Sequence, residues 1–247
     1  MRVGITGASF GIGKSLAYLY AKEGYNLSLV SRNIDALTKI KEDIENKYNV
    51  DVKVYSFDLT NDVYPLFLKL KDNDIDIWIN NAAMGYANRF LDHDINKEHD
   101  LLNLNIKALT DFCYYFGYLF KEKKKGMILN ISSVGSMMPG PFIQTYYASK
   151  AYLNSLTLSL SYEFKRDNIK IKAFNLPRVD TNFDMNAGRT KALKKGISPS
   201  KIALKIYKKS KSKKAIINIG FLTKVTSFLS KVLPSSLFLH FVGKSLE

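Results

Sequence analysis

The sequence predicts a single α/β domain in which helices cover both faces of a parallel β-sheet. Short apolar segments alternate with longer amphipathic segments along most of the chain, as the strands and helices of such a domain do. A glycine-rich turn follows the first apolar segment directly. The length of 247 residues suits one core of the larger kind, so we expect one domain over residues 1–247.

The first repeat of this pattern covers residues 3–20. An apolar run at 3–6 is bounded by glycine, and apolar residues then recur at helical spacing from Ile12 onward, which predicts a strand, a tight turn and a helix. Later repeats place strands at 27–30, 52–57, 75–79, 127–131 and 169–174, and helices at 34–47, 61–72, 95–124 and 145–166. This alternation is typical of a doubly wound, Rossmann-type sheet, whose ligand site lies at the carboxyl ends of the strands.

The pattern becomes less regular after residue 177. We interpret residues 182–212 as a substrate-loop region that contains a helix at about 199–208, with Ser198 as its N-cap. A last strand is expected at 215–219. This region would therefore complete the sheet after covering the ligand site.

The tail at 221–245 is predicted to be an amphipathic helix. Its apolar residues follow helical spacing over 221–242, with lysine and serine between them. Pro234 and two lysines argue against a span through a membrane. Two interpretations stay open: packing against this domain or a twin subunit, or contact of 221–242 with a membrane surface or the substrate.

Charge limits the classes of partner. The 37 lysine and arginine residues exceed the 22 acidic residues, and the net charge of +15 favours phosphates, acidic carriers or anionic membranes. No nucleic-acid-binding motif accompanies that charge, so we expect no nucleic-acid partner. His93, His99 and His240 lack metal-ligand spacing, so no metal is expected.

The cysteine content and the first residues indicate the compartment. Cys113 is the sole cysteine, which excludes an internal disulfide and fits a reducing environment. The chain leads straight into its first strand without the charged, apolar and small-residue regions of a secretory signal. We therefore expect a cytoplasmic protein.

The turn after the first strand has the features of a phosphate site. It reads Thr6-Gly7-Ala8-Ser9-Phe10-Gly11-Ile12-Gly13. Gly7 allows a sharp exit from the strand, while Gly11 and Gly13 remove side chains where a pyrophosphate approaches backbone N–H groups and the positive end of a helix. The spacing differs from the commoner dinucleotide fingerprint, so a purely structural turn is the alternative.

The end of the second strand indicates which dinucleotide is bound. The chain reads Ser31-Arg32-Asn33 there, and no acid that would hold the ribose hydroxyls of NAD occurs before Asp35. Arg32, with Ser31 as a helper, suits the 2′-phosphate, so we expect NADPH or NADP rather than NAD; a solvated arginine is the alternative. Asp58 either accepts from the adenine amino group or caps the next helix.

A tyrosine–lysine pair near the start of the helix at 145–166 supplies the expected acid–base chemistry. Tyr146 and Lys150 are four residues apart and therefore lie on one helix face. We expect the ammonium to lower the pKa of the phenol from its usual value of about 10. Ser132 and Ser133 end the preceding strand, where a hydroxyl can bind a substrate oxygen.

These motifs resemble those of the short-chain dehydrogenase/reductase family over residues 2 to about 181. The glycine turn matches the cofactor turn of that family, Asn80-Asn81-Ala82-Ala83 its Asn-Asn-Ala-Gly motif, and Tyr146 with Lys150 its active-site pair. The resemblance implies that Tyr146 exchanges the substrate proton, that Lys150 binds the nicotinamide ribose, and that Ser133 holds the carbonyl.

Two further segments are assigned by the same resemblance. Asn105, in Leu104-Asn105-Ile106-Lys107-Ala108, matches the helix asparagine that supports a proton-relay water, with Asn103 as the weaker choice. Pro177-Arg178-Val179-Asp180-Thr181 resembles the Pro-Gly-x-x-x-Thr segment that covers nicotinamide. Arg178 and Ala83 each replace a glycine of the family pattern.

The motifs and the resemblance together give the expected site. The catalytic set is Asn105, Ser133, Tyr146 and Lys150. The cofactor-binding set is Gly7, Ser9, Phe10, Gly11, Ile12, Gly13, Ser31, Arg32, Asp58, Leu59, Asn81, Ala82, Ala83, Tyr146, Lys150, Pro177, Val179 and Thr181.

The C-terminal part indicates a branch of the family. An apolar helix follows 216–220, unlike the ending of the bacterial 3-oxoacyl-carrier-protein reductases. This layout resembles more the branch of hydroxysteroid dehydrogenases and long-chain 3-ketoacyl reductases. The resemblance implies an NADPH-dependent reductase that acts on a small, hydrophobic ketone or aldehyde, as a homo-oligomer for which we expect a dimer.

Two alternatives stay open. The first is reduction of 3-oxoacyl groups on a carrier protein or CoA, for which the lysine-rich stretches at 121–125 and 191–214 offer docking charge. The second is an NADP-binding sensor or scaffold without turnover, which the presence of Ser133, Tyr146 and Lys150 disfavours.

Overall fold

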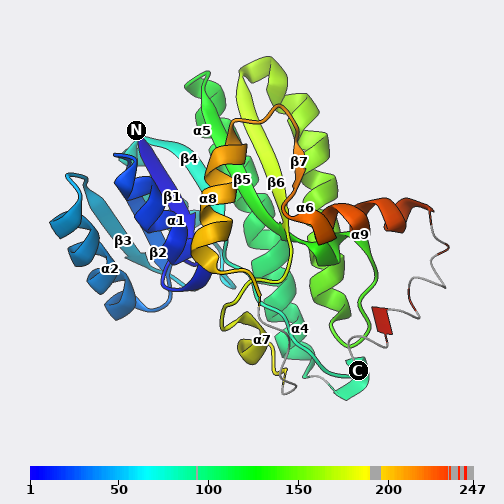
Figure 1. The fold of residues 1–247 in the computed structure, drawn as a ribbon. Coiled ribbons are helices and arrows are strands. Elements are labelled where there is room, and N and C mark those ends of the chain that lie inside the picture. The colour runs from blue at the N-terminus through cyan, green and yellow to red at the C-terminus, as the bar shows by residue number, and fades with distance from the viewer. Residues whose placement is uncertain (93, 190–195, 233, 235–238, 240–241, 244–247) are drawn as a thin grey trace.

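The computed structural model describes the chain except for residues 93, 190–195, 233, 235–238, 240–241 and 244–247. Within this part, seven parallel strands form one sheet in the order β3-β2-β1-β4-β5-β6-β7, as Figure 1 shows. The strands are β1 Arg2–Thr6, β2 Asn26–Ser31, β3 Val52–Ser56, β4 Ile75–Asn80, β5 Gly126–Ser133, β6 Ile169–Leu176 and β7 Ile216–Asn218. The predicted parallel sheet is confirmed.

Helices cover both faces of the sheet (Figure 1). They are α1 Gly11–Lys22, α2 Ile34–Lys47, α3 Tyr64–Leu70, α4 Ile95–Leu102, α5 Leu109–Glu122, α6 Gln144–Glu163, α7 Phe183–Asn186, α8 Pro199–Ser210 and α9 Phe221–Val232. Short segments with other helical patterns are η1 Lys71–Asn73, η2 Phe90–Asp92, η3 Asn103–Ala108, η4 Val134–Met137 and η5 Phe164–Asp167.

Two apolar clusters lie on opposite faces of the sheet. Apolar residues of α1, α2 and α8 pack into one cluster, and those of α3, α5 and α6 pack into the other. Strands buried on both faces match the continuous apolar runs in the sequence. The doubly wound, Rossmann-type architecture is therefore confirmed.

The topology fixes where a ligand site can form. The strand order reverses at β1, because β2 and β3 lie on one side of it and β4 to β7 lie on the other. A crevice forms at the carboxyl ends of the strands where the order reverses. Thr6, Asn80, Ser133 and Leu176 end their strands at this edge.

The helix predicted at 95–124 changes its hydrogen-bond pattern in the middle. α4 passes directly into η3, a π-helical segment, which passes into α5. A π-helical hydrogen bond spans one more residue than an α-helical one. Asn105 lies in this segment, and its side chain bonds the backbone of Met84 on the loop after β4. The local change in pitch thus accompanies a contact between the helix and the site.

Other differences are confined to the ends of elements. α3 begins at Tyr64 rather than at 61, because carboxylates of Asp58 and Asp62 accept backbone N–H groups in the turns before it. Ser198 occupies the N-cap position of α8, as predicted, but its hydroxyl makes no capping bond and lies 3.4 Å from that of Ser200.

Some predictions fall outside the described residues. These are His93, His240, the lysines at 191, 194 and 195, and parts of the tail helix predicted for 221–245. Of that tail, α9 accounts for Phe221–Val232.

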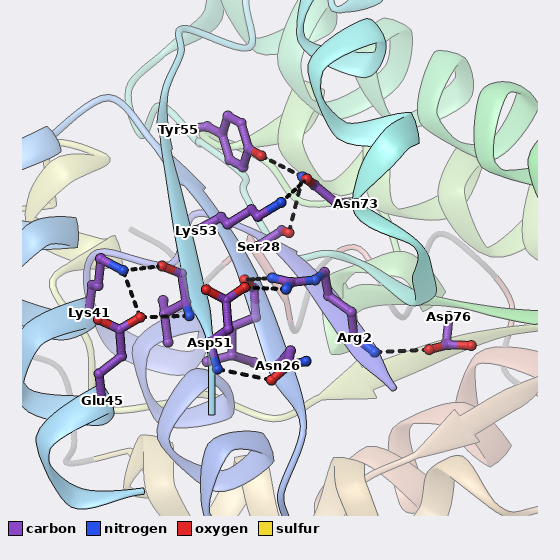
Figure 2. A network of polar contacts seen from close by, with 12 residues as sticks. Arg2, Asn26, Ser28, Lys41, Glu45, Asp51, Lys53, Tyr55, Asn73 and Asp76 are labelled. Carbon is purple, nitrogen blue, oxygen red and sulfur yellow. Dashed lines mark hydrogen bonds and ion pairs between the residues drawn. The ribbon is translucent and has the colours of Figure 1, made fainter. Parts of the chain in front are cut away.

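A polar network ties the amino-terminal edge of the sheet, as Figure 2 shows. The Arg2 backbone N–H donates to Asp76 Oδ2 at 2.9 Å, and its guanidinium donates to the Leu27 carbonyl oxygen at 2.6 Å and pairs with Asp51. This pairing holds the pKa of Asp51 below its ordinary value. Because the network lies at the edge opposite the crevice, it supports the sheet and leaves the site to other residues.

Candidate active site

A cavity of about 790 Å³ lies at the carboxyl ends of the strands. Small-molecule sites typically measure ~300–1,000 Å³, so this one accommodates a cofactor and a substrate. The predicted cofactor-binding residues line it, apart from Gly13: Gly7, Ser9, Phe10, Gly11, Ile12, Ser31, Arg32, Asp58, Leu59, Asn81, Ala82, Ala83, Tyr146, Lys150, Pro177, Val179 and Thr181.

The glycine turn between β1 and α1 has the backbone that only glycine adopts readily. Gly7 has φ +64° and Gly11 has φ +56°. A Cβ on Gly13 would lie 2.2 Å from the Gly7 carbonyl oxygen and 2.6 Å from Asn81 Nδ2. Gly13 therefore allows α1 to pack against its own turn, and the expectation that it opens space for a pyrophosphate is wrong.

The first turn of α1 has the properties of an anion site. Phe10 occupies the N-cap position without a side-chain capping bond, and the turn holds no acidic residue. The cavity wall includes residues 9–12. Backbone N–H groups at an uncapped helix start attract anions, so this turn fits a pyrophosphate.

Asn81 holds two strand ends together. Its Nδ2 donates to the carbonyl oxygens of Thr6 and Gly7 at 2.8 and 3.1 Å. In return, the Thr6 hydroxyl oxygen accepts the backbone N–H groups of Asn81 and Ala82, both at 3.0 Å. The predicted structural role of this motif, joining neighbouring loops, is confirmed.

Arg32 and Asp58 lie together at the β2 and β3 end of the cavity. The Arg32 side chain is 70% exposed, and its Nη1 is 3.8 Å from Asp58 Oδ2. Asp58 Oδ1 accepts the backbone N–H and the hydroxyl of Thr60 at 3.0 and 2.9 Å. Asp58 thus closes a turn at 58–60 and does not cap α3, whose N-cap is Val63, so the predicted capping role is wrong. Arg32 keeps most of its donors for a ligand.

Tyr146, Lys150 and Ser133 meet on one wall of the cavity. Lys150 Nζ lies 5.6 Å from the centre of the Tyr146 ring and donates to the Ile131 carbonyl oxygen at 2.9 Å. The Ser133 hydroxyl hydrogen-bonds with the Tyr146 phenol. The spacing on one face of α6 brings Tyr146 and Lys150 into the site, and the end of β5 brings Ser133 there.

Burial controls how the pair titrates. It raises the pKa of Tyr146, while the hydrogen bond with Ser133 acts in the opposite direction. Burial also lowers the pKa of Lys150, to about 8. The expectation that Lys150 lowers the pKa of Tyr146 is wrong for this geometry, because the ammonium lies beside the ring and desolvation dominates.

The strand end that carries Ser133 is held by several hydrogen bonds. The Ser133 hydroxyl oxygen accepts the Gly135 N–H at 3.1 Å, and the Ser136 hydroxyl donates to the Ser133 carbonyl oxygen at 2.7 Å. The neighbouring Ser132 also lines the cavity, and its buried hydroxyl has no hydrogen-bond partner among the described residues. Ser132 therefore remains a second hydroxyl that a ligand can satisfy.

Asn105 lies behind the cavity rather than on its wall. Its Oδ1 accepts the Met84 N–H at 3.0 Å, and its Nδ2 donates to the Met84 carbonyl oxygen at 2.8 Å and to the Ser149 hydroxyl at 3.1 Å. These bonds connect the loop after β4 to the helix that carries Tyr146 and Lys150. The structure thus gives Asn105 a positioning role.

The structure adds cavity residues that the motifs did not name. Arg178 Nη2 is 3.0 Å from Asp184 Oδ2, and Arg189 Nη1 is 3.5 Å from Asp184 Oδ1. Phe183 packs with its ring centre 5.0 Å from that of Tyr146. Arg178 was visible in the sequence as a departure from the family pattern, whereas the other three come from a loop whose path no periodicity reveals.

The family is shown by comparison with known proteins. The family described as short chain dehydrogenase matches residues 2–192. The chain belongs to the short-chain dehydrogenase family. The match covers the cofactor turn, the asparagine motif and the tyrosine–lysine pair, so the resemblance seen in the sequence is confirmed.

Named relatives agree with the predicted branch. A very-long-chain 3-oxoacyl-CoA reductase from Vanderwaltozyma polyspora is 32% identical over 181 residues, which is 68% of this chain and 52% of that protein. The human inactive hydroxysteroid dehydrogenase-like protein 1 is 34% identical over 174 residues, 68% of this chain and 53% of its own length. The chain thus spans about half the length of these curated relatives.

Solved structures share the fold over nearly the whole chain. A short-chain dehydrogenase from Sphingobium yanoikuyae, in complex with NADPH, has a TM-score of 0.83 and 25% identity, covering 95% of this chain and 97% of its own.

Within the described part of the chain, no helix has the length and apolar character needed to cross a bilayer.

Proposed function

We propose that this chain is an NADPH-dependent oxidoreductase that reduces a hydrophobic ketone or aldehyde to an alcohol. One observation carries the proposal. Ser133, Tyr146 and Lys150 line the same cavity as the uncapped start of α1 and Arg32. The cavity thus holds acid–base groups beside an anion site that fits the phosphates of a dinucleotide. Hydride transfer from a dinucleotide to a carbonyl requires both in one place.

The residues present fit NADPH. The first turn of α1 would bind the pyrophosphate, Arg32 and Ser31 the 2′-phosphate, and Lys150 the nicotinamide ribose. When bound, this cofactor supplies a hydride to the carbonyl carbon. The Sphingobium yanoikuyae relative binds NADPH, which supports the choice over NADH.

Tyr146 would act as the general acid. Burial raises its pKa, so the phenol is protonated at neutral pH and can donate to the developing alkoxide oxygen. Ser133 would hold the same oxygen through its hydroxyl. Lys150 is fixed next to Tyr146 by the Ile131 carbonyl oxygen and would resupply the proton.

Turnover with a panel of ketones and aldehydes tests this proposal. NADPH oxidation should depend on an added carbonyl compound and should be faster with apolar ketones than with small polar ones. Tight binding of NADPH without its oxidation by any compound of a broad panel would instead favour an NADP-binding sensor or scaffold. The human relative, which is described as inactive, supports that alternative.

Reduction of 3-oxoacyl-CoA is the second candidate, favoured by the names of the yeast relatives. The hydride and proton transfers would be the same, and the ketone would be at carbon 3 of an acyl chain. Rates with a 3-oxoacyl-CoA and with a simple ketone of equal chain length separate the two candidates. A much higher rate with the 3-oxoacyl-CoA than with the simple ketone would identify the acyl-CoA as the substrate.

We also propose a dimer that forms through one face of α5 and α6. Large side chains are exposed on both helices: Tyr114, Tyr118, Tyr152, Leu158 and Tyr162. Thr110 on α5 and Tyr152 on α6 share a hydrogen bond at 2.9 Å, so the two helices present one continuous surface. A second copy of the same surface is the partner that we expect, and sedimentation equilibrium measures it.

We further propose that the protein is cytoplasmic. The thiol of Cys113 is fully enclosed, and burial raises its pKa to about 12. Because Cys113 is the sole cysteine and its thiol is buried, the fold uses no internal disulfide, as is usual for proteins of a reducing compartment. Cell fractionation with a cytoplasmic marker tests this proposal.

A further inference from the structure

Two arginines share one carboxylate on the wall of the cavity. Arg178 and Arg189 both pair with Asp184, and their side chains are 38% and 19% exposed. Each guanidinium has five N–H donors, whereas one carboxylate neutralises a single positive charge. The cluster therefore carries a formal charge of about +1, with donors to spare, in a partly desolvated position.

This cluster lies at the substrate end of the cavity. Phe183, the neighbour of Asp184 in the chain, packs with its ring centre 5.0 Å from that of Tyr146, and Arg189 lines the same cavity. Arg32 lies elsewhere, because it follows β2 and Arg178 follows β6, four places apart in the sheet. At ~4.8 Å per strand, that separation is roughly 19 Å, so the two basic regions serve different groups.

The backbone holds these arginines in place. The Arg178 carbonyl oxygen accepts the Ile197 N–H at 3.1 Å, and Val179 forms a bridge with Ile197. The Arg189 N–H donates to the Asp184 carbonyl oxygen at 3.0 Å. A Cβ on Gly196 would lie 2.6 Å from the Asp180 nitrogen, so the return segment packs closely against the Arg178 loop.

We propose that Arg178 and Arg189 form a binding site for an anionic group of the carbonyl substrate, placed beside Tyr146. Paired guanidinium groups bind carboxylate or phosphate oxygens through charge-assisted hydrogen bonds. Asp100, on α4, is a further carboxylate of the cavity wall, and within the described part of the chain no ion pair joins it to either arginine. The inference rests on the proposed function and specifies the substrate as an oxo acid or an oxo compound with a phosphate.

Matched pairs of substrates test the charge requirement. The series consists of medium-chain oxo acids that differ in the number of carbons between ketone and carboxylate, each with its methyl ester. One arm replaces the carboxylate with a phosphate, compared with the uncharged alcohol. We expect at least one anion to exceed its neutral partner about tenfold or more in kcat/KM, with an advantage that falls as ionic strength rises. The arm with the larger advantage in kcat/KM shows whether the site binds a carboxylate or a phosphate.

Substitutions locate the effect. Arg189→Gln and Arg178→Gln should each reduce kcat/KM for the anion by about 10- to 100-fold and that for the ester by less than about threefold. Arg166→Gln, at a side chain that is 79% exposed on η5, is the matched control and should change neither. Equal losses for acid and ester in the Arg189 and Arg178 variants would show that the cluster only holds the loop.

The outcomes separate the inference from the function on which it depends. Turnover of esters without any preference for an anion overturns the inference and leaves the reductase intact. Where neither acid nor ester is reduced, calorimetry with the corresponding hydroxy acids and hydroxy esters decides. Binding of the acid that Arg189→Gln abolishes supports the site, and equal or absent binding overturns it.

Discussion

Lys150 is enclosed by protein, and its Nζ donates to a single backbone oxygen, that of Ile131. Burial disfavours its charged form, which explains the pKa of about 8. The same burial keeps the Tyr146 phenol protonated. The sequence spacing predicted that the two side chains share a face, but it contained nothing about the depth of the site, so the direction of the Tyr146 pKa could not be predicted.

The Lys150 pKa predicts a pH dependence of stability. Between pH 8 and 10.5 the unfolded lysine binds a proton that the folded lysine has released, so the free energy of unfolding rises with pH in this window. The gain is on the order of 1–3 kcal/mol. Denaturant unfolding at pH 7.5 and 9.5 should show it in the wild type. An equal gain in Lys150→Met would contradict the assignment to Lys150.

Arg32 predicts the choice of cofactor. Arg32→Asp places a carboxylate where the 2′-phosphate would bind, so the ratio of kcat/KM for NADPH to that for NADH should fall by about 100-fold. Steady-state kinetics with both cofactors measure the ratio. The control is Arg166→Asp, at an exposed position on η5, which should leave the ratio as it is. The same ratio in wild type and Arg32→Asp would refute the assigned phosphate contact.

At the scale of elements, the alternation of apolar strands and amphipathic helices was sufficient to predict the sheet. The observed order of strands is compatible with short right-handed crossovers between parallel strands, a rule that restricts the possible orders. The π-helical segment η3 was not predictable, because residues 95–124 keep an apolar period compatible with one plain helix. A tertiary contact accompanies it, because Asn105 meets the Met84 backbone on a loop that lies 21 residues earlier.

Asn105 predicts a loss of stability when its side chain is removed. Asn105→Ala leaves partly buried polar groups of Met84 without their Asn105 partner, which should lower the free energy of unfolding by about 1–3 kcal/mol. Thermal and denaturant unfolding measure this change. Asn103→Ala, in the same segment, is the control and should lower the stability less. Equal effects of the two variants would remove the special role of Asn105.

At the scale of the whole molecule, the site forms where separate segments converge, and motifs identified most of them. Thr6, Asn81, Ser133 and Tyr146 were found because each ends a strand, follows one or lies in the first turn of a helix at one edge of the sheet. Phe183, Asp184 and Arg189 were missed because they lie in the loop after Thr181, whose path no repeat encodes. That loop carries the charges beside Tyr146, so the fold was predicted better than the substrate preference.

α9 has an unusual orientation for an amphipathic helix, and Figure 1 shows it at the opposite end of the molecule from α2. Thr223 is buried, whereas the apolar residues Phe221, Leu222, Phe228 and Val232 are exposed. Lys224 and Lys231 are exposed on the same helix. With a net charge of +15, this surface suits an anionic bilayer, and we propose peripheral membrane contact through the region 221–242.

Vesicle sedimentation tests the contact made by α9. The full chain should bind vesicles that contain phosphatidylserine more strongly than neutral ones, because apolar burial and charge act together. Replacing Phe221 and Phe228 with serine should reduce binding about tenfold or more. Leu68→Ser, at an exposed site on α3, is the control. Binding that survives the loss of both phenylalanines would show that α9 is not the contact.

The most direct measurement of the proposed chemistry is the turnover of Tyr146→Phe beside its affinity for NADPH. The substitution removes the proton donor and keeps the ring that packs on Phe183. We predict that NADPH oxidation with an accepted ketone falls by about 100-fold or more, while the Kd for NADPH changes less than about threefold. Full turnover in this variant would contradict the account.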